Sequence, residues 1–188
     1  MTNLHVDQPN QLHRRFFEIP NLKYAMAYVW FQKDTVIQQL LHQLKYEGNE
    51  ALGLLLGEIY GEQLSAYFSE EWDLITTVPI HYKKQRKRGY NQSHKIAEGL
   101  SLKLQIPFEP IIVKSVNRKS QTKKDRVQRF DNVESTFLLK SPNENFKGKH
   151  ILLVDDVFTT GATLQACSQP LQQAGAKISI ATIACTRK

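Results

Sequence analysis

Two adjacent carboxylates, Asp155 and Asp156, stand directly before a run of residues that could bind an anion. Five small residues lie in that run: Thr159, Thr160, Gly161, Ala162 and Thr163. Their size lets backbone N–H groups converge on a phosphate, and a helix that begins there adds unpaired N–H donors and a positive dipole end. Carboxylates beside a phosphate would repel it unless they accept hydrogen bonds from sugar hydroxyls or hold Mg²⁺ through water. The stretch LVDDVFTTGAT therefore predicts a site for a ribose phosphate.

Three other interpretations account for parts of this stretch. A strand that ends in acidic residues also occurs in P-loop nucleotide triphosphatases, but the sequence contains no GxxxxGK[ST]. A phosphoacceptor receiver domain would carry its acidic residues after the first strand rather than near the C-terminus. An aspartate pair that caps a turn before a helix explains the two acids alone, but leaves the rest of the pattern without a reason.

A second candidate segment, RGYNQ at 88–92, follows a strongly basic stretch. Arg88 offers a planar guanidinium that suits pyrophosphate. Gly89 allows the backbone to approach a ligand closely. Asn91 and Gln92 could bond ligand oxygens, or Asn91 could simply cap the next helix while Arg88 is solvated.

Positive charge is concentrated in two short segments. The formal net charge is +7 and the pI about 9.4, with five Lys and Arg residues at 81–90 and seven at 114–129. This clustering indicates a polyanionic ligand, although two solvated basic loops explain it about as well. Candidate cations for a nucleic-acid track are Lys83, Lys84, Arg86 and Lys87. Tyr82 and Tyr90 are the main candidates for stacking on bases.

Hydrophobic patterning predicts alternating strands and helices. We expect strands at 24–31, 73–80, 110–115, 135–140, 150–155 and 177–185. Helices are expected at about 36–44, 49–67, 93–104 and 162–174, the last kinked or ended early by Pro170. The continuous run ILLV favours a parallel sheet covered on both faces, and such sheets bind ligands beyond the carboxyl ends of their strands. Residues 116–130 are expected to form a long loop that closes over a ligand, follows a nucleic acid or has no role.

Composition narrows the class of protein. A chain of 188 residues most simply forms one domain. Cys167 and Cys185 are its only cysteines, and without a CxxC pair we expect no structural zinc. The first twenty residues lack the apolar core of a signal peptide, and no apolar run is long enough to span a bilayer. We therefore expect a cytoplasmic chain without membrane insertion.

Two motifs resemble known families. The pattern around VDDVFTTGAT resembles the ribose-phosphate motif of type I phosphoribosyltransferases, which bind phosphoribosyl pyrophosphate (PRPP) with Mg²⁺. The segment VPIHYKKQRKRGYNQ resembles the VPxHxxRxxxRGFNQ segment of the ComF family, phosphoribosyltransferase-like proteins associated with DNA uptake. LLHQLKY at 40–46 and RFDNVESTF at 129–137 agree with that family, so the resemblance extends over about 35–184.

The resemblance assigns roles to these residues. It implies that Asp155 and Asp156 contact the ribose 2′- and 3′-hydroxyls, and that residues 159–163 hold the 5′-phosphate. With Arg88, the two acids form the expected catalytic set. The expected pyrophosphate or acceptor side comprises Pro79, Ile80, His81, Arg88, Gly89, Tyr90, Asn91 and Gln92. Mg²⁺ would be bound mainly through PRPP and water, with Asp155 and Asp156 as further candidate ligands.

The resemblance also implies an architecture and a function. The expected fold is an α/β, type I phosphoribosyltransferase-like domain, with a central, mostly parallel sheet, helices on both faces and a small hood of N-terminal elements. Residues 1–23 would form a short extension in place of the zinc module of many ComF chains, and 24–188 a single domain. The expected activity is Mg²⁺-dependent transfer of ribosyl phosphate from PRPP to an unknown acceptor, linked to DNA uptake or nucleotide metabolism. Alternatives are PRPP sensing without turnover, or handling of single-stranded DNA beside a DNA-uptake helicase. A homodimer is left open.

Overall fold

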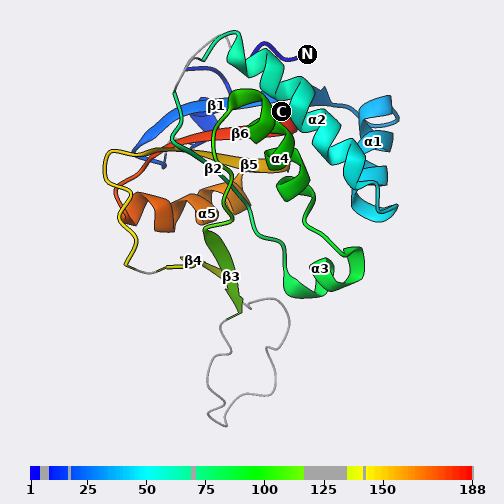
Figure 1. Ribbon diagram of the computed structural model, residues 1–188. Helices are drawn as coiled ribbons and strands as arrows, with labels where there is room; N and C mark the ends of the chain where they lie inside the picture. The colour runs from blue at the N-terminus through cyan, green and yellow to red at the C-terminus, as the bar shows by residue number, and fades with distance from the viewer. Residues whose placement is uncertain (5–8, 17, 69–70, 117–134, 142, 188) are drawn as a thin grey trace, which may run out of the picture.

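Four parallel strands form the centre of the fold, which we describe from a computed structural model (Figure 1). The structure describes residues 1–4, 9–16, 18–68, 71–116, 135–141 and 143–187. The strand order is β1 (Leu22–Phe31), β6 (Lys177–Thr186), β5 (His150–Phe158) and β2 (Leu74–Thr77), and each neighbouring pair is parallel. The apolar run at the start of β5 is fully buried, as expected for a strand covered on both faces. The predicted parallel sheet is confirmed.

Helices cover both faces of this sheet (Figure 1). One face carries α1 (Val36–Tyr46), α2 (Glu50–Ser65) and α4 (Gln92–Leu104), whose apolar side chains share a core with Leu152 of β5. On the opposite face lie α5 (Ala162–Gln173) and the short 3₁₀ helix η1 (His13–Phe16), which pack around Leu153. Adjacent residues of β5 thus point into different cores, because side chains alternate along a strand.

Glycines bring α2 and α4 into backbone contact. A β-carbon added to Gly57 would lie 2.1 Å from the carbonyl oxygen of Ile96, and one added to Gly99 would lie 2.1 Å from that of Leu54. No residue with a side chain fits at either position without separating the helices. This contact fixes the position of α4, whose first turn reaches the ends of β2 and β5.

The basic stretch after β2 is a helix, although the sequence predicted no element between residues 80 and 93. It forms α3 (Tyr82–Arg88), which begins after His81 and ends at Gly89 with a φ of 85°. Its lysine, arginine and glutamine residues favour helix, and glycine is the usual residue in the left-handed conformation that ends one. The sequence YKKQRKR has no apolar stripe, so hydrophobic periodicity gives no sign of this helix.

One predicted strand end is wrong, and of the two outcomes predicted at Pro170, a kink or an early end, the early end does not occur. β5 continues beyond Asp155 to Phe158, because β6 pairs with it as far as Cys185. Helix α5 continues past Pro170 to Gln173, so proline does not end it early. Pro170 and the following Leu171 are buried, and their packing compensates for the missing backbone hydrogen bond.

Outside the main sheet, β3 (Ile112–Val116) and β4 (Ser135–Leu139) pair as a separate antiparallel ribbon. The long loop predicted at 116–130 lies almost entirely outside the described residues. Before β1, Leu4, Leu12, Phe16 and Ile19 are buried in the same core as α5. The boundary between an extension and a domain at residue 23 stays a prediction. Within the described part of the chain, no helix combines the length and apolarity needed to cross a bilayer.

Candidate functional site

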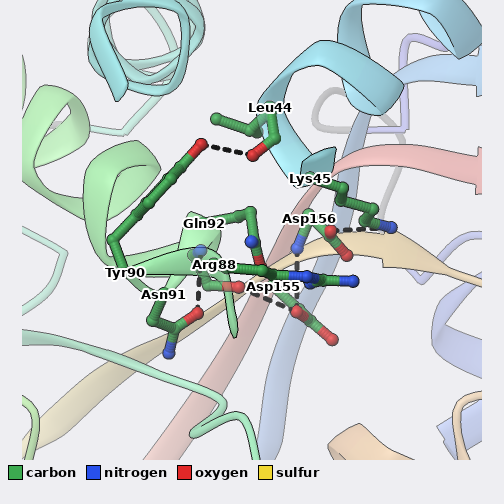
Figure 2. Close-up of polar contacts among 9 residues, drawn as sticks. Leu44, Lys45, Arg88, Tyr90, Asn91, Gln92, Asp155 and Asp156 are labelled. Carbon is green, nitrogen blue, oxygen red and sulfur yellow. Dashed lines mark hydrogen bonds and ion pairs between the residues drawn. The ribbon is translucent and has the colours of Figure 1, made fainter. Parts of the chain in front are cut away.

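The two aspartates lie at the carboxyl end of β5, and each is held by a different helix (Figure 2). Asp155 Oδ1 accepts hydrogen bonds from Ser93 Oγ, at 2.9 Å, and from the backbone N–H of Asp156, at 2.9 Å. Asp156 Oδ2 lies 2.8 Å from Lys45 Nζ at the end of α1. The acidic pair, as we call Asp155 and Asp156, is therefore positioned by α4 on one side and α1 on the other.

Burial makes one carboxyl of the acidic pair hard to ionise. It raises the pKa of Asp155 to about 7, and the neighbouring charge of Asp156 acts in the same direction. The hydrogen bonds from Asp156 N–H and Ser93, together with the Lys45 ammonium, oppose the rise. A ligand that donates hydrogen bonds to the pair would favour the ionised form, which is what sugar hydroxyls do.

The predicted phosphate loop follows directly after β5. Gly161 stands at the N-cap of α5 with a φ of 89°. In the first turn of the helix, Ala162 N–H donates a long hydrogen bond of 3.5 Å to Thr160 Oγ1. Residues Thr159, Thr160, Ala162 and Thr163 are exposed around it. A β-carbon on Gly161 would lie 2.8 Å from Phe158 Cε2 and 3.1 Å from Phe16 Cε1, in a conformation that side chains disfavour. Glycine is therefore required to present the N–H groups of this helix end.

Arg88 is fixed rather than solvated. Its Nη1 donates to Gln92 Oε1 at 2.9 Å, and its guanidinium carbon lies 5.1 Å from the centre of the Tyr46 ring. The other amide atom of Gln92, Nε2, is a buried donor without a partner in the described part of the structure. Buried donors are normally satisfied, so a ligand or water oxygen would be favourable at this position.

Other residues of RGYNQ stabilise the fold around the site. Tyr90 is buried, with 8% of its surface exposed, and its hydroxyl donates to the carbonyl of Leu44. Its predicted use as a stacking surface for bases is therefore wrong. Asn91 caps α4 by accepting from Ser93 N–H and donates to the carbonyl of Val78. These bonds join the start of α4 to the residue that follows β2.

The remaining predicted residues lie between β2 and α4. Pro79, Ile80 and His81 are partly exposed in the link to α3, and His81 Nδ1 accepts from Lys83 N–H at 3.2 Å. The cations of the predicted nucleic-acid track are exposed on α3: Lys83, Lys84, Arg86 and Lys87. Among the described residues, none of these four forms an ion pair with a carboxylate.

Comparison with known proteins identifies the family. Residues 91–188, which include the predicted phosphate loop and the acidic pair, match the phosphoribosyl transferase domain family. The chain belongs to that family.

Its curated relatives are competence and DNA utilization proteins. The chain is 24% identical to competence protein ComFC of Bacillus subtilis, over 81% of this chain and 60% of that protein. It is 36% identical to competence protein F of Haemophilus influenzae, over 55% of this chain and 45% of that protein. It is 28% identical to the DNA utilization protein YhgH of Escherichia coli, over 74% of this chain and 63% of that protein. The predicted ComF resemblance is confirmed, and the chain spans about half to two thirds of the length of these relatives.

Solved phosphoribosyltransferases share a lower sequence identity with this chain. Adenine phosphoribosyltransferase from Leishmania donovani matches with a TM-score of 0.48 and 12% sequence identity, over 88% of this chain and 84% of that one. A hypoxanthine phosphoribosyltransferase from Staphylococcus aureus matches with a TM-score of 0.43 and 13% sequence identity, over 80% of this chain and 71% of that one.

Two residues at this phosphoribosyltransferase-like site were not predicted from the sequence. Lys45 and Ser93 bind the acidic pair, yet both lie far before it in the chain. Lys45 belongs to LLHQLKY, one of the segments that resemble the ComF family, and that match was the available signal. For Ser93, nothing in the sequence indicated a contact with the acidic pair beyond its position in the first turn of a predicted helix.

Proposed function

We propose that this chain binds PRPP with Mg²⁺ and transfers its ribosyl phosphate to an acceptor. The observation that carries the proposal is the placement of the acidic pair and the Gly161 loop at the same strand end. The carboxylates would accept hydrogen bonds from the ribose hydroxyls, while the N–H groups after Gly161 would bind the 5′-phosphate. These contacts at both ends of the ribose phosphate would hold the sugar in place while pyrophosphate departs.

Mg²⁺ fits this site as a companion of PRPP. Within the described residues, there is no group of three or more His, Cys, Asp or Glu side chains that could hold a metal. Magnesium characteristically keeps several waters and binds substrate phosphates with one or two carboxylates, here the acidic pair. When bound, it would neutralise charge on the departing pyrophosphate. Arg88, fixed by Gln92 and Tyr46, would add a guanidinium on the same side.

Calorimetric titration with Mg²⁺ and PRPP tests the proposal. The natural chain should bind, and the Asp155→Asn/Asp156→Asn variant should lose about 100-fold in affinity or more, because two hydrogen bonds to charged groups are weakened. The matched control is Glu58→Gln/Glu62→Gln on α2, which removes two charges and should leave affinity unchanged. Absence of binding to the natural chain would refute the proposal. If PRPP binds, pyrophosphate release with candidate bases or amines distinguishes a transferase from a sensor.

Handling of single-stranded DNA is a second candidate function. It is supported by the exposed, unpaired cations of α3 in the described structure and by the names of the relatives. If α3 contacts a strand, Lys83→Gln/Arg86→Gln should weaken single-strand affinity. The slope of log affinity against log salt should also fall by about 0.7 for each phosphate that α3 no longer neutralises. Lys140→Gln/Lys147→Gln, which removes two exposed lysines elsewhere, is the control. An unchanged slope in the α3 variant would exclude α3 from DNA contact.

A further inference from the structure

A buried threonine, Thr182, lies beside the acidic pair. It belongs to β6, the strand between β1 and β5 (Figure 1), and its paired position on β5 is Asp155. Leu153 and Ile180, which are paired two residues earlier along these strands, belong to the core that contains α5. Because side chains alternate along a strand, Asp155 and Thr182 lie side by side on the same face of the sheet as that pair.

The Thr182 hydroxyl has no partner among the described residues. Thr182 is fully buried, and its Oγ1 forms no hydrogen bond within the described part of the chain. On the β1 side its paired position is Ala27, whose side chain has no polar atom. Buried hydroxyls are normally hydrogen-bonded, because an unpaired one has lost its bonds to water. In this row of the sheet, the side chain that can accept from Thr182 is that of Asp155.

The Asp155 carboxyl has acceptor capacity left for such a bond. A carboxylate has about four lone-pair positions on its two oxygens. The bonds that Asp155 receives from described residues, from Ser93 Oγ and Asp156 N–H, both go to Oδ1. Burial raises the pKa of the Cys167 thiol on α5, and the charge of Asp155 acts in the same direction. The carboxyl is therefore within electrostatic reach of α5, on the face that it shares with Thr182.

We infer that Thr182 is a positioning residue for a sugar at the acidic pair, and that its hydroxyl turns toward Asp155 and donates to Oδ2 when the sugar binds. The inference rests on the proposed function, because that function brings a ribose to the acidic pair. With Ser93 at Oδ1 and Thr182 at Oδ2, the carboxylate cannot rotate, and its other lone pairs keep a fixed direction for the ribose hydroxyls. A hydrogen bond to an ionised carboxylate is also stronger than one between neutral groups.

Titration of the full chain with Mg²⁺ and PRPP tests the role of the hydroxyl. Thr182→Val keeps the branched shape but has no donor, so it should weaken PRPP binding about tenfold or more. Thr182→Ser keeps the donor and should remain within about twofold of the natural chain. Thr77→Val is the matched control: Thr77 is also buried, with an Oγ1 that has no partner among the described residues, but it is paired with the apolar Val154. It should change the affinity about twofold or less.

A role in packing alone predicts the opposite order. Serine lacks the methyl group and leaves a small cavity, whereas valine fills the space that threonine fills. Urea midpoints should therefore show that Thr182→Val is at least as stable as the natural chain without ligand, because it removes an unpaired buried hydroxyl. Unchanged PRPP affinity in Thr182→Val, or an equal loss in Thr182→Ser or Thr77→Val, would overturn the inference.

The same titrations with ribose 5-phosphate separate the inference from the proposed function. This probe carries the ribose hydroxyls and the 5′-phosphate without the diphosphate. Binding of ribose 5-phosphate but not of PRPP would refute the proposed function, while the variants compared with this probe would still decide the role of Thr182. A natural chain that binds neither compound would refute both.

Discussion

Replacing Gly99 with alanine should destabilise the folded chain by about 3 kcal/mol or more, the upper range for overpacking a tight contact. The added carbon would lie 2.1 Å from the carbonyl oxygen of Leu54 and 2.7 Å from the backbone nitrogen of Glu58. Backbone atoms cannot turn away as a side chain can, so α2 and α4 would have to separate. In an unconstrained helix the same change stabilises by about 1 kcal/mol, so the sign of the effect tests the contact.

Urea denaturation of a glycine series measures this effect. Gly57→Ala should resemble Gly99→Ala, since its added carbon would also meet a backbone oxygen at 2.1 Å. Gly53→Ala should cost less, because its added carbon would approach Lys95 Cβ at 2.7 Å and Leu44 Cδ1 at 2.9 Å rather than a backbone oxygen at 2.1 Å. If Gly99→Ala raises the urea midpoint instead, the two helices do not pack backbone to backbone.

Asp155→Asn should stabilise the ligand-free chain above neutral pH, although it should impair PRPP binding. The pKa of Asp155 is raised from its ordinary value of 3.8 to about 7. Between these values the folded chain binds more protons than the unfolded chain, so its stability falls as pH rises. Asparagine removes that loss and can still accept from Ser93 and Asp156 N–H. At pH 8 the gain should be about 2–4 kcal/mol, and it should shrink toward zero near pH 4.

Denaturation midpoints measured across pH 4–8, without Mg²⁺, provide the test. Asp73→Asn is a control with the opposite sign. The hydrogen bonds from His150 N–H and the Lys149 ammonium lower the pKa of Asp73, so its contribution to stability is present above its ordinary pKa and lost on acidification. Asp73→Asn should therefore destabilise at neutral pH. A pH-independent difference between Asp155→Asn and the natural chain would contradict the raised pKa.

The sequence predicted those parts of the site that are contiguous in the chain. Asp155, Asp156 and the Gly161 loop lie within nine residues, and their residue types describe the chemistry of a sugar phosphate by themselves. Lys45 and Ser93 escaped prediction because helices far from β5 in the sequence bring them to the acidic pair. Only the packing of α1 and α4 on the sheet makes them neighbours.

The incorrect predictions for helix α3 and for Tyr90 have a common physical origin. Helix α3 is exposed and its sequence has no apolar periodicity, so local propensity and the glycine after it were the only signals. Tyr90 follows Arg88 closely in a polar segment, and its chain position does not reveal that its ring enters the core. Patterns of burial predicted the sheet well because burial creates them, whereas they carry little information about exposed elements and tertiary contacts.

The hydrogen bonds at the start of α4 have a consequence for affinity. Asn91 ties this turn to the carbonyl of Val78, and Ser93 ties it to Asp155. Asp155 is therefore preorganised: its position is set before a ligand arrives, and binding loses little further conformational entropy there. Part of the affinity at the acidic pair thus originates in Asn91, which acts by restricting motion rather than by touching the ligand.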